Sequence, residues 1–244
     1  MENEKPRFEE IEGVTTMNLP YAGLKFNAQR VGPRDFYELR DVDYGEGFWM
    51  PTIPELAPLI HASLENKRKY ETAKHVVMAL KNHTLTGNTA IHYFPKGMFV
   101  EDDPDIGSMA TILTPTLKVL EERLGKHEEK GVMLSDDGRL RFTPDDFKRG
   151  PQTSLELSTN KGLIAVTGSG ENAEDLARAS DHYKKNPRFL VLEGVDHPTT
   201  RIVCLDSGHL AHKLIINANK WEGYQNHTYG VQGIKKEEKK HGGD

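Results

Sequence analysis

The stretch HLAHKLIINANKWEGYQNHTYGV, residues 209–231, combines a strand-like apolar pattern with many Asn, His, Tyr and Gly residues. As a strand over residues 209–219, it places apolar and polar side chains on opposite faces. Its apolar face holds Leu210, Leu214 and Ile216, and its other face holds His209, Ala211, Lys213, Asn217 and Asn219. His212 and Ile215 interrupt this alternation. The pattern predicts a strand with one core-facing side and one outward side.

Four further residues extend this polar segment: Trp221, Tyr224, Asn226 and His227. They lie in an expected loop and at the start of the next strand, where no core periodicity explains a Trp and a Tyr. Aromatic anchors among small residues that form hydrogen bonds are typical of recognition surfaces. A polar hairpin with two partly packed aromatic rings is the alternative, and composition alone does not separate the two.

The composition is that of an ordinary globular protein, with 244 residues, 36% hydrophobic content and 28% charged content. A net charge of -5 gives no basic footprint, so we expect neither a nucleic-acid partner nor an anionic membrane partner. Cys204 is the only cysteine, which excludes an internal disulfide. The N-terminal segment lacks the apolar core of a signal peptide, so we expect a cytoplasmic protein, although a virion-borne or surface-displayed one would look the same.

Helical periodicity predicts helices within residues 50–66, 69–82 and 114–131, the first capped by Thr52 and the third by Thr114. Turn signals predict hairpins over 89–103 and 132–143. A strand over 162–170, a helix over 172–185 and a strand over 188–195 follow. The remaining chain predicts strands only, over 200–207, 209–219 and 228–234. Residues 1–234 are expected to form one domain, and the charged residues 235–244 a disordered tail.

The segment Gly168–Ala173 has the spacing G-x-G-x-x-A between an expected strand and an expected helix, and Glu193 ends the next strand. This spacing is typical of dinucleotide sites, in which glycines let the backbone approach a pyrophosphate and an acid binds the ribose. However, Glu171, Glu174 and Asp175 would place carboxylates where phosphates need positive charge. An acid-capped helix after a glycine turn is therefore favoured, and a nucleotide-binding enzyme is kept as the alternative function.

Other patterns give little support for metal or covalent chemistry. His209 and His212 lie three residues apart, so in a strand they would point to opposite faces and could not share one metal ion. The acidic turns 101–105 and 135–138 lack the ligand spacing of a calcium loop. Cys204 lies between apolar neighbours, which favours a buried structural thiol. We therefore expect no catalytic residue, no metal and no cofactor.

Two segments carry a resemblance to a known family. GFWMPTIPEL, Gly47 to Leu56, resembles the W-R-L-P-T-x-x-E-L element of C-type-lectin-like domains, with Phe48, Trp49 and Met50 where Trp, Arg and Leu are usual. Residues 201–234 resemble the ending of the variable proteins of diversity-generating retroelements, particularly those of archaea and their viruses. The resemblance implies an α+β, C-type-lectin-like fold in which helices flank a small, mostly antiparallel sheet. It also implies a variable region over about 201–231.

In that family, exposed positions of the variable region are rewritten by adenine-directed mutagenic reverse transcription. Codons such as AAC yield most of the residue types found at the outward positions of this chain, whereas Lys213 and Trp221 cannot arise from that codon. The resemblance therefore implies a non-enzymatic recognition protein whose ligand is a protein or a cell-surface molecule. Its expected binding residues are His209, Ala211, His212, Lys213, Asn217, Asn219, Trp221, Tyr224, Asn226 and His227.

Overall fold

The computed structural model describes residues 10–11, 14–105, 107–108, 111–112, 114–208, 212–220 and 226–234. A short two-stranded sheet is formed by β6 (Gly107–Ser108) and β7 (Thr111–Ile112). The main sheet contains β1 (Glu10–Ile11), β2 (Val14–Leu19), β3 (Leu24–Arg34), β4 (Thr84–Phe94), β5 (Gly97–Asp102), β8 (His127–Glu129), β9 (Val132–Leu134), β10 (Leu140–Pro144), β11 (Gly150–Pro151), β12 (Arg188–Leu190), β13 (Thr199–Asp206), β14 (Ile215–Lys220) and β15 (Asn226–Gly233).

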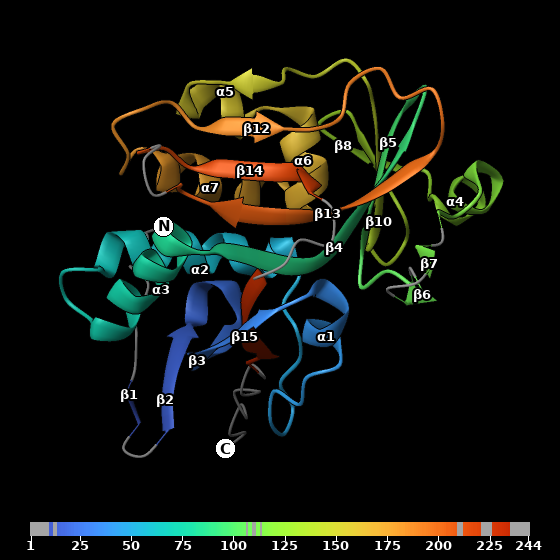
Figure 1. The fold of residues 1–244 in the computed structure, drawn as a ribbon. Coiled ribbons are helices and arrows are strands. Elements are labelled where there is room, and N and C mark those ends of the chain that lie inside the picture. The colour runs from blue at the N-terminus through green and yellow to red at the C-terminus, as the bar shows by residue number, and fades with distance from the viewer. Residues whose placement is uncertain are drawn as a thin grey trace, which may run out of the picture.

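Within the described residues the main sheet has 13 strands, with β4 at its branch point (Figure 1). One path runs β1-β2-β3-β15-β4-β13-β14-β12-β11, and β5, β10, β9 and β8 extend from β4 along a second path. β15 pairs parallel to β4, and β12 pairs parallel to β14. The prediction of a small sheet is therefore wrong, because the sheet is large and mixed, although most of its strand pairs are antiparallel as predicted.

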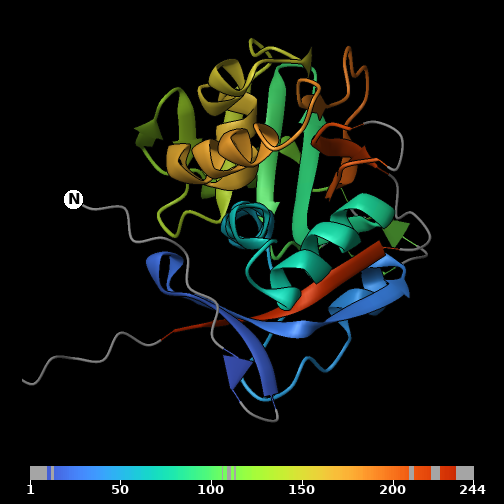
Figure 2. The same ribbon diagram turned by 90° about the vertical axis from the view of Figure 1, so that its left-hand side faces the viewer.

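Seven α-helices and a 3₁₀ turn, η1 (Pro20–Ala22), complete the described structure: α1 (Phe36–Arg40), α2 (Ile53–Asn66), α3 (Glu71–Asn82), α4 (Leu117–Arg123), α5 (Ser154–Ser158), α6 (Lys161–Thr167) and α7 (Gly170–Ser180). The largest apolar cluster joins α2, α3, α6 and α7 to one face of the sheet. Figures 1 and 2 show α5, α6 and α7 on a single side of β12, β13 and β14. None of the described helices has the length and apolar character needed to cross a membrane.

Helix α2 begins as its sequence predicts, because Thr52 and Glu55 form a capping box. The backbone N–H of Thr52 donates to Glu55 Oε2 over 2.7 Å, and the Thr52 hydroxyl donates to the same oxygen over 3.0 Å. The motif around this cap also reaches the last strand, since the backbones of Trp49 and Val231 exchange two hydrogen bonds of 2.9 Å. The predicted helices at α3 and α7 and both predicted hairpins are confirmed as well.

The prediction of a strand over 162–170 is wrong, because Lys161–Thr167 forms helix α6. Asn160 starts the helix by accepting a hydrogen bond from the Leu163 N–H over 3.2 Å. The run Leu163–Val166 is buried on every side, so it shows neither a helical stripe nor a strand alternation. A short, fully apolar run of this kind has no period that separates the two structures.

Three other predictions need correction. The helix predicted over 114–131 ends at Arg123, and residues 127–129 form strand β8. Thr116, not Thr114, caps α4 and accepts from Val119, whereas Thr114 bonds to the Thr200 hydroxyl over 2.9 Å. The expected strand over 209–219 begins only at Ile215 in its described part. The short helices α1 and α5 and the strands β2 and β3 were not predicted, because each is too short or too mixed to show a clear period. Residues 235–244, predicted to be disordered, lie outside the described residues.

Two buried ionic groups connect β5 to its neighbours. Asp102 accepts from Arg141 Nη1 over 2.5 Å and from the Thr89 hydroxyl over 2.6 Å. The Thr89 hydroxyl in turn accepts from the Ile53 N–H over 2.9 Å, which ties the start of α2 to the sheet. The Arg141 side chain is 2% exposed, so its charge depends on Asp102 for compensation.

On the opposite side of β5, the Glu101 carboxylate bonds to His92 Nε2 over 3.1 Å and accepts from Arg123 over 2.5 Å. His92 Nδ1 lies 2.9 Å from the Thr200 hydroxyl, so the network continues into β13. Burial alone would raise the pKa of Glu101, but the hydrogen bonds from His92 and Arg123 outweigh it and hold that pKa below its ordinary value. Glu101 is therefore a buried carboxylate that stays ionised.

Candidate functional site

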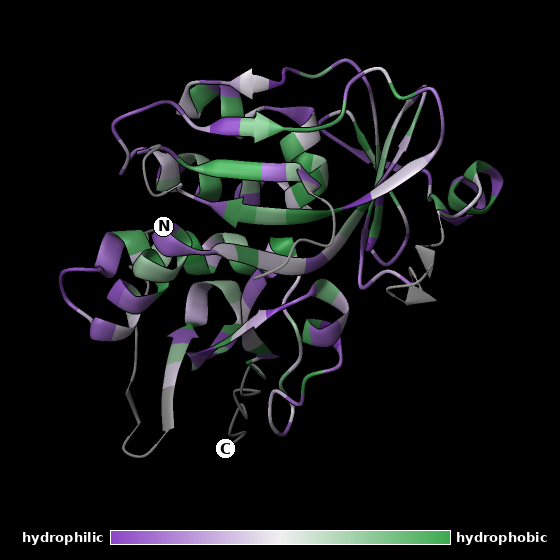
Figure 3. Cartoon of the chain, in the orientation of Figure 1, coloured by the Kyte–Doolittle hydropathy of each residue, from purple (hydrophilic) through white to green (hydrophobic). Residues whose placement is uncertain are grey.

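β14 has one face built into the core and one face directed away from the helices. Leu214, Ile216 and Ala218 are all 0% exposed and pack in the cluster that contains α6 and α7. β14 lies between β13 and β12, and it is hydrogen-bonded on both sides. In Figure 3 part of β13 and the beginning of β14 are coloured as hydrophobic. The position of this strand is thus fixed by backbone pairing and by its inner face.

The outer face of β14 carries the side chains that alternate with this apolar set. Asn217 is half-buried and Asn219 is exposed, and the Asn219 N–H donates to Asn217 Oδ1 over 3.0 Å. The strand registers place Leu190 beside Asn217 and Arg188 beside Ile215. In Figure 1 no helix lies in front of β12 and β14 in this view. We call Arg188, Leu190, Ile215, Asn217 and Asn219 the β14 face.

The β14 face can hydrogen-bond, attract an anion and contact an apolar group, but it holds no acid–base pair or nucleophile. Its two amides each offer donors and acceptors, Arg188 offers a fixed cation, and Leu190 and Ile215 offer apolar area. Such a mixture suits recognition by shape and polar contact. Sequence analysis missed Arg188 and Leu190, because their place beside β14 depends on a parallel pairing between separate segments.

The chain before β14 is held in place by its backbone. His212 is exposed and has a φ of +48°, a left-handed conformation that few residues other than glycine adopt. Its carbonyl accepts from the Lys185 N–H over 3.2 Å, and the Leu214 carbonyl accepts from the Arg188 N–H over 2.9 Å. Lys213 is half-buried between them. His212 and Lys213 therefore lie at the edge of the β14 face, where we expected binding residues.

The prediction that Asn226 and His227 face outward is wrong. Asn226 is 0% exposed and His227 is 1% exposed. They begin β15, which lies between β3 and β4 in the middle of the sheet. The His227 ring packs against the His83 ring, with the two ring centroids 4.3 Å apart. The Asn226 carbonyl lies so close to Gly32 that a side chain at Gly32 would collide with it. Both residues belong to the interior, so a change at either position would disturb the sheet.

Four other predicted site residues lie outside the described residues: His209, Ala211, Trp221 and Tyr224. In the sequence, residues 209–211 precede the described segment 212–214 that leads into β14, and residues 221–225 directly follow β14. Among the described residues of the predicted site, His212 and Asn219 are exposed, and Lys213 and Asn217 are half-buried. The other four remain predictions.

The glycine turn at 168–170 lies between two helices and does not follow a strand. The N-terminus of α7 is already occupied, because the Gly170 N–H donates to Glu129 Oε1 over 3.3 Å and Ser169 Oγ accepts from the Asn172 N–H over 3.2 Å. A carboxylate of the protein thus stands where a bound phosphate would need to lie. Glu193 is on an exposed loop near Arg149, 4.0 Å from its Nε. This geometry gives no support to the alternative of a nucleotide site.

The remaining chemical candidates also have structural partners. Cys204 is 0% exposed, which confirms that the thiol is buried, and its sulfur lies 3.3 Å from the Thr86 hydroxyl. In the turn at 135–138, the Asp137 carboxylate accepts from Ser135 and from the Arg139 N–H, which lowers its pKa. The described part of the chain contains no group of three His, Cys, Asp or Glu residues that could hold a metal ion.

Comparison with known proteins gives one structural similarity and no sequence match. No protein-family model and no curated protein matches the chain. One solved structure is similar to this chain, with 14% sequence identity and a TM-score of 0.45. It is described by the words "Accommodation of massive sequence variation in Nanoarchaeota by the C-type lectin fold". The similarity covers 91% of this chain and 98% of that one. The fold of this chain is therefore defined by its own strand order and burial.

Proposed function

We propose that this chain is a non-enzymatic ligand-binding protein whose binding surface combines the β14 face with the segments 209–213 and 221–225. The observation that carries the proposal is the separation of the two faces of β14. Leu214, Ile216 and Ala218 are fully buried, whereas Asn217 and Asn219 reach outward. Substitutions at exposed positions usually change stability by less than about 0.5 kcal/mol, so the outer residues can change while the fold is kept.

The proposal extends to the type of protein: a C-type-lectin-like variable protein of a diversity-generating retroelement. The support is the resemblance of Gly47–Leu56, together with the contacts that this segment makes. It caps α2 through Thr52 and pairs with β15 through Trp49, so it joins the helix layer to the strands of the proposed variable region. The diversified positions would be His209, Ala211, Asn217, Asn219 and Tyr224. Buried Asn226 and His227 are not among them.

The first test measures binding and stability in the same variants. Peptides selected from a random phage-displayed library against the wild-type protein should lose at least about tenfold in affinity for the Asn217→Ala/Asn219→Ala double variant, which corresponds to about 1.4 kcal/mol. Trp221→Ala and Tyr224→Ala should weaken the same peptides. Thermal unfolding of all these variants should match the wild type within a few degrees, since Asn217 and Asn219 lie outside the core and the proposal puts Trp221 and Tyr224 on the same binding surface.

Asn82→Ala is the matched control, because Asn82 is exposed at the end of α3 in the helix layer. This variant should bind the selected peptides like the wild type. Peptides that bind the double variant and the wild type equally well would contradict the proposed surface. A large loss of stability in Trp221→Ala or Tyr224→Ala would show that these rings belong to the core.

The retroelement assignment has a separate test in the neighbouring DNA. We expect a reverse transcriptase gene and a near-copy of the sequence encoding about residues 201–231, with the differences between the two copies falling at adenines. Sequencing of the locus from several isolates would show whether codons 217 and 219 vary while codons 214, 216 and 218 do not. Variation spread evenly over inner and outer positions would contradict the assignment.

A further inference from the structure

A cavity of about 240 Å³ opens between three loops, and none of its lining residues belongs to the β14 face. Pro95 and Gly97 line it from the turn between β4 and β5, and Asp145 lines it from the segment after β10. Gly194 and Asp196 complete the wall from the loop between β12 and β13. Ligand sites for drug-sized molecules usually measure about 300–1,000 Å³, so this cavity has the size for a single side chain or a similar small group.

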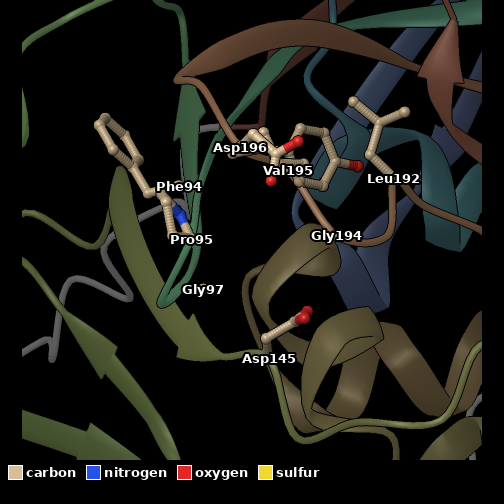
Figure 4. Close-up of a pocket in the computed structure, with 9 residues that line it drawn as sticks. Phe94, Pro95, Gly97, Asp145, Leu192, Gly194, Val195 and Asp196 are labelled. Carbon is tan, nitrogen blue, oxygen red and sulfur yellow. The ribbon is translucent and has the colours of Figure 1, made fainter.

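The floor of the cavity is rigid. Tyr93 lines it and is 4% exposed, and its hydroxyl donates to the Ala218 carbonyl over 2.6 Å. In Figure 4 the Phe94 ring points away from the cavity, and it packs against Phe99 with ring centroids 5.6 Å apart. The apolar part of the lining therefore comes from the Tyr93 ring, Pro95, Leu192 and Val195. The Tyr93 ring, anchored by its hydroxyl, offers a flat surface against which a planar group can stack.

The charged side chains in the lining are both carboxylates. Figure 4 shows Asp145 at one side of the cavity and Asp196 at the other. Asp145 forms an ion pair with Arg149, which lies outside the lining. Arg201 is also outside the lining, and its Nη1 donates to the Thr200 carbonyl over 2.8 Å. Asp196 is exposed and forms no ion pair within the described chain, so the cavity has a carboxylate available for a cation.

The Arg149–Asp145 pair beside the cavity indicates which type of cation would suit the cavity. The Arg149 guanidinium pairs with Asp145 while it lies 4.7 Å over the ring of Phe147. A guanidinium is planar, binds carboxylates through two donors and stacks on flat apolar groups, whereas an ammonium is a compact point charge. A second guanidinium could bind Asp196 in the same manner with its plane against Tyr93 or Pro95.

We propose that this cavity binds an alkylguanidinium group, supplied by an arginine side chain of a partner or by a free organic cation. The cavity shares no lining residue with the β14 face, so either proposal can fail without the other. The Asp196 carboxylate pairs with the cation, Asp145 adds attraction from the opposite wall, and the Tyr93 ring excludes water from one side. Citrulline has the same shape as arginine without the charge, and it should bind poorly.

The experiment follows the backbone amides of Gly97 and Gly194 by NMR while L-arginine methyl ester is added to the full chain. Both amides should shift saturably, and L-citrulline methyl ester should shift neither at the same concentration. Asp196→Asn should weaken arginine-ester binding at least threefold, and Glu193→Gln should leave it within twofold, because Glu193 neighbours the cavity without lining it. Asp145→Asn gives a second test, since it removes the carboxylate of the opposite wall and should also weaken binding.

Binding of an arginine-containing peptide distinguishes the two possible sources of the guanidinium group. Tighter binding of N-acetyl-Gly-Arg-Gly-amide than of the ester would support a protein partner, and tighter binding of the ester would support a free cation. Equal shifts with the citrulline and arginine esters would overturn the proposal. So would an affinity for the arginine ester that stays unchanged in both Asp196→Asn and Asp145→Asn.

Discussion

Asp102→Asn is expected to lower the free energy of unfolding by about 3–5 kcal/mol, because it leaves the Arg141 charge buried without compensation. The asparagine keeps an oxygen that can accept from Thr89, so the change isolates the lost charge. Two Arg141 nitrogens, Nε and Nη2, already have no hydrogen-bond partner, which makes this guanidinium depend strongly on Asp102. Urea unfolding followed by circular dichroism would measure the effect.

Asp103→Asn is the matched control at the neighbouring position. The Asp103 side chain is 57% exposed, and its φ of +52° is a conformation that asparagine tolerates. Its bond from Asn88 can also be kept, so the change should stay within about 0.5 kcal/mol of the wild type. If Asp102→Asn and Asp103→Asn lowered the free energy of unfolding by similar amounts, the buried Asp102–Arg141 pair would contribute no more stability than the exposed Asp103.

Glu101→Gln is expected to lower stability by about 1.5–3 kcal/mol at pH 7, the usual range for hydrogen bonds to a charged group. The folded-state pKa of Glu101 is lowered, so its contribution is fully present above the unfolded pKa and is lost as the pH falls through the folded pKa. The difference between wild type and variant should therefore be constant near neutral pH and shrink below the ordinary value of 4.5.

Unfolding by urea at several pH values between 3 and 7 would check this dependence. Glu121→Gln serves as the control, because Glu121 pairs with Lys96 at the surface and is 46% exposed. Surface pairs of this kind contribute about 0–1 kcal/mol, so that variant should follow the wild type. A difference between wild type and Glu101→Gln that grows on acidification would contradict the proposed charge state.

Local signals were sufficient for the elements with a clear period. Thr52 and Glu55 marked the start of α2, and the Pro95-Lys96-Gly97 turn marked the hairpin of β4 and β5. They failed at Lys161–Thr167, where an apolar run buried on all sides has no preferred period. Sheet size and direction were also beyond local signals, because the parallel pairs β15–β4 and β12–β14 join segments far apart in the chain.

The same limit applies to the candidate site. Alternation correctly placed Asn217 and Asn219 opposite Ile216, since period-two patterning needs only the strand itself. It did not reveal that Asn226 enters the middle of the sheet, because that depends on which strands flank β15. The carboxylates of the cavity, Asp145 and Asp196, come from loops that meet only after folding, so no spacing in the sequence could connect them.

The strand order affects how the chain folds while it is being synthesised. Among the described strands, β1, β2 and β3 join the rest of the sheet through β15, which begins 192 residues after the end of β3 (226 − 34). Because synthesis adds about 5–20 residues per second, β1, β2 and β3 remain for roughly ten seconds or more without β15, their partner in the sheet. During that interval the exposed edge of β3 is a place where a chaperone would be most useful to the nascent polypeptide.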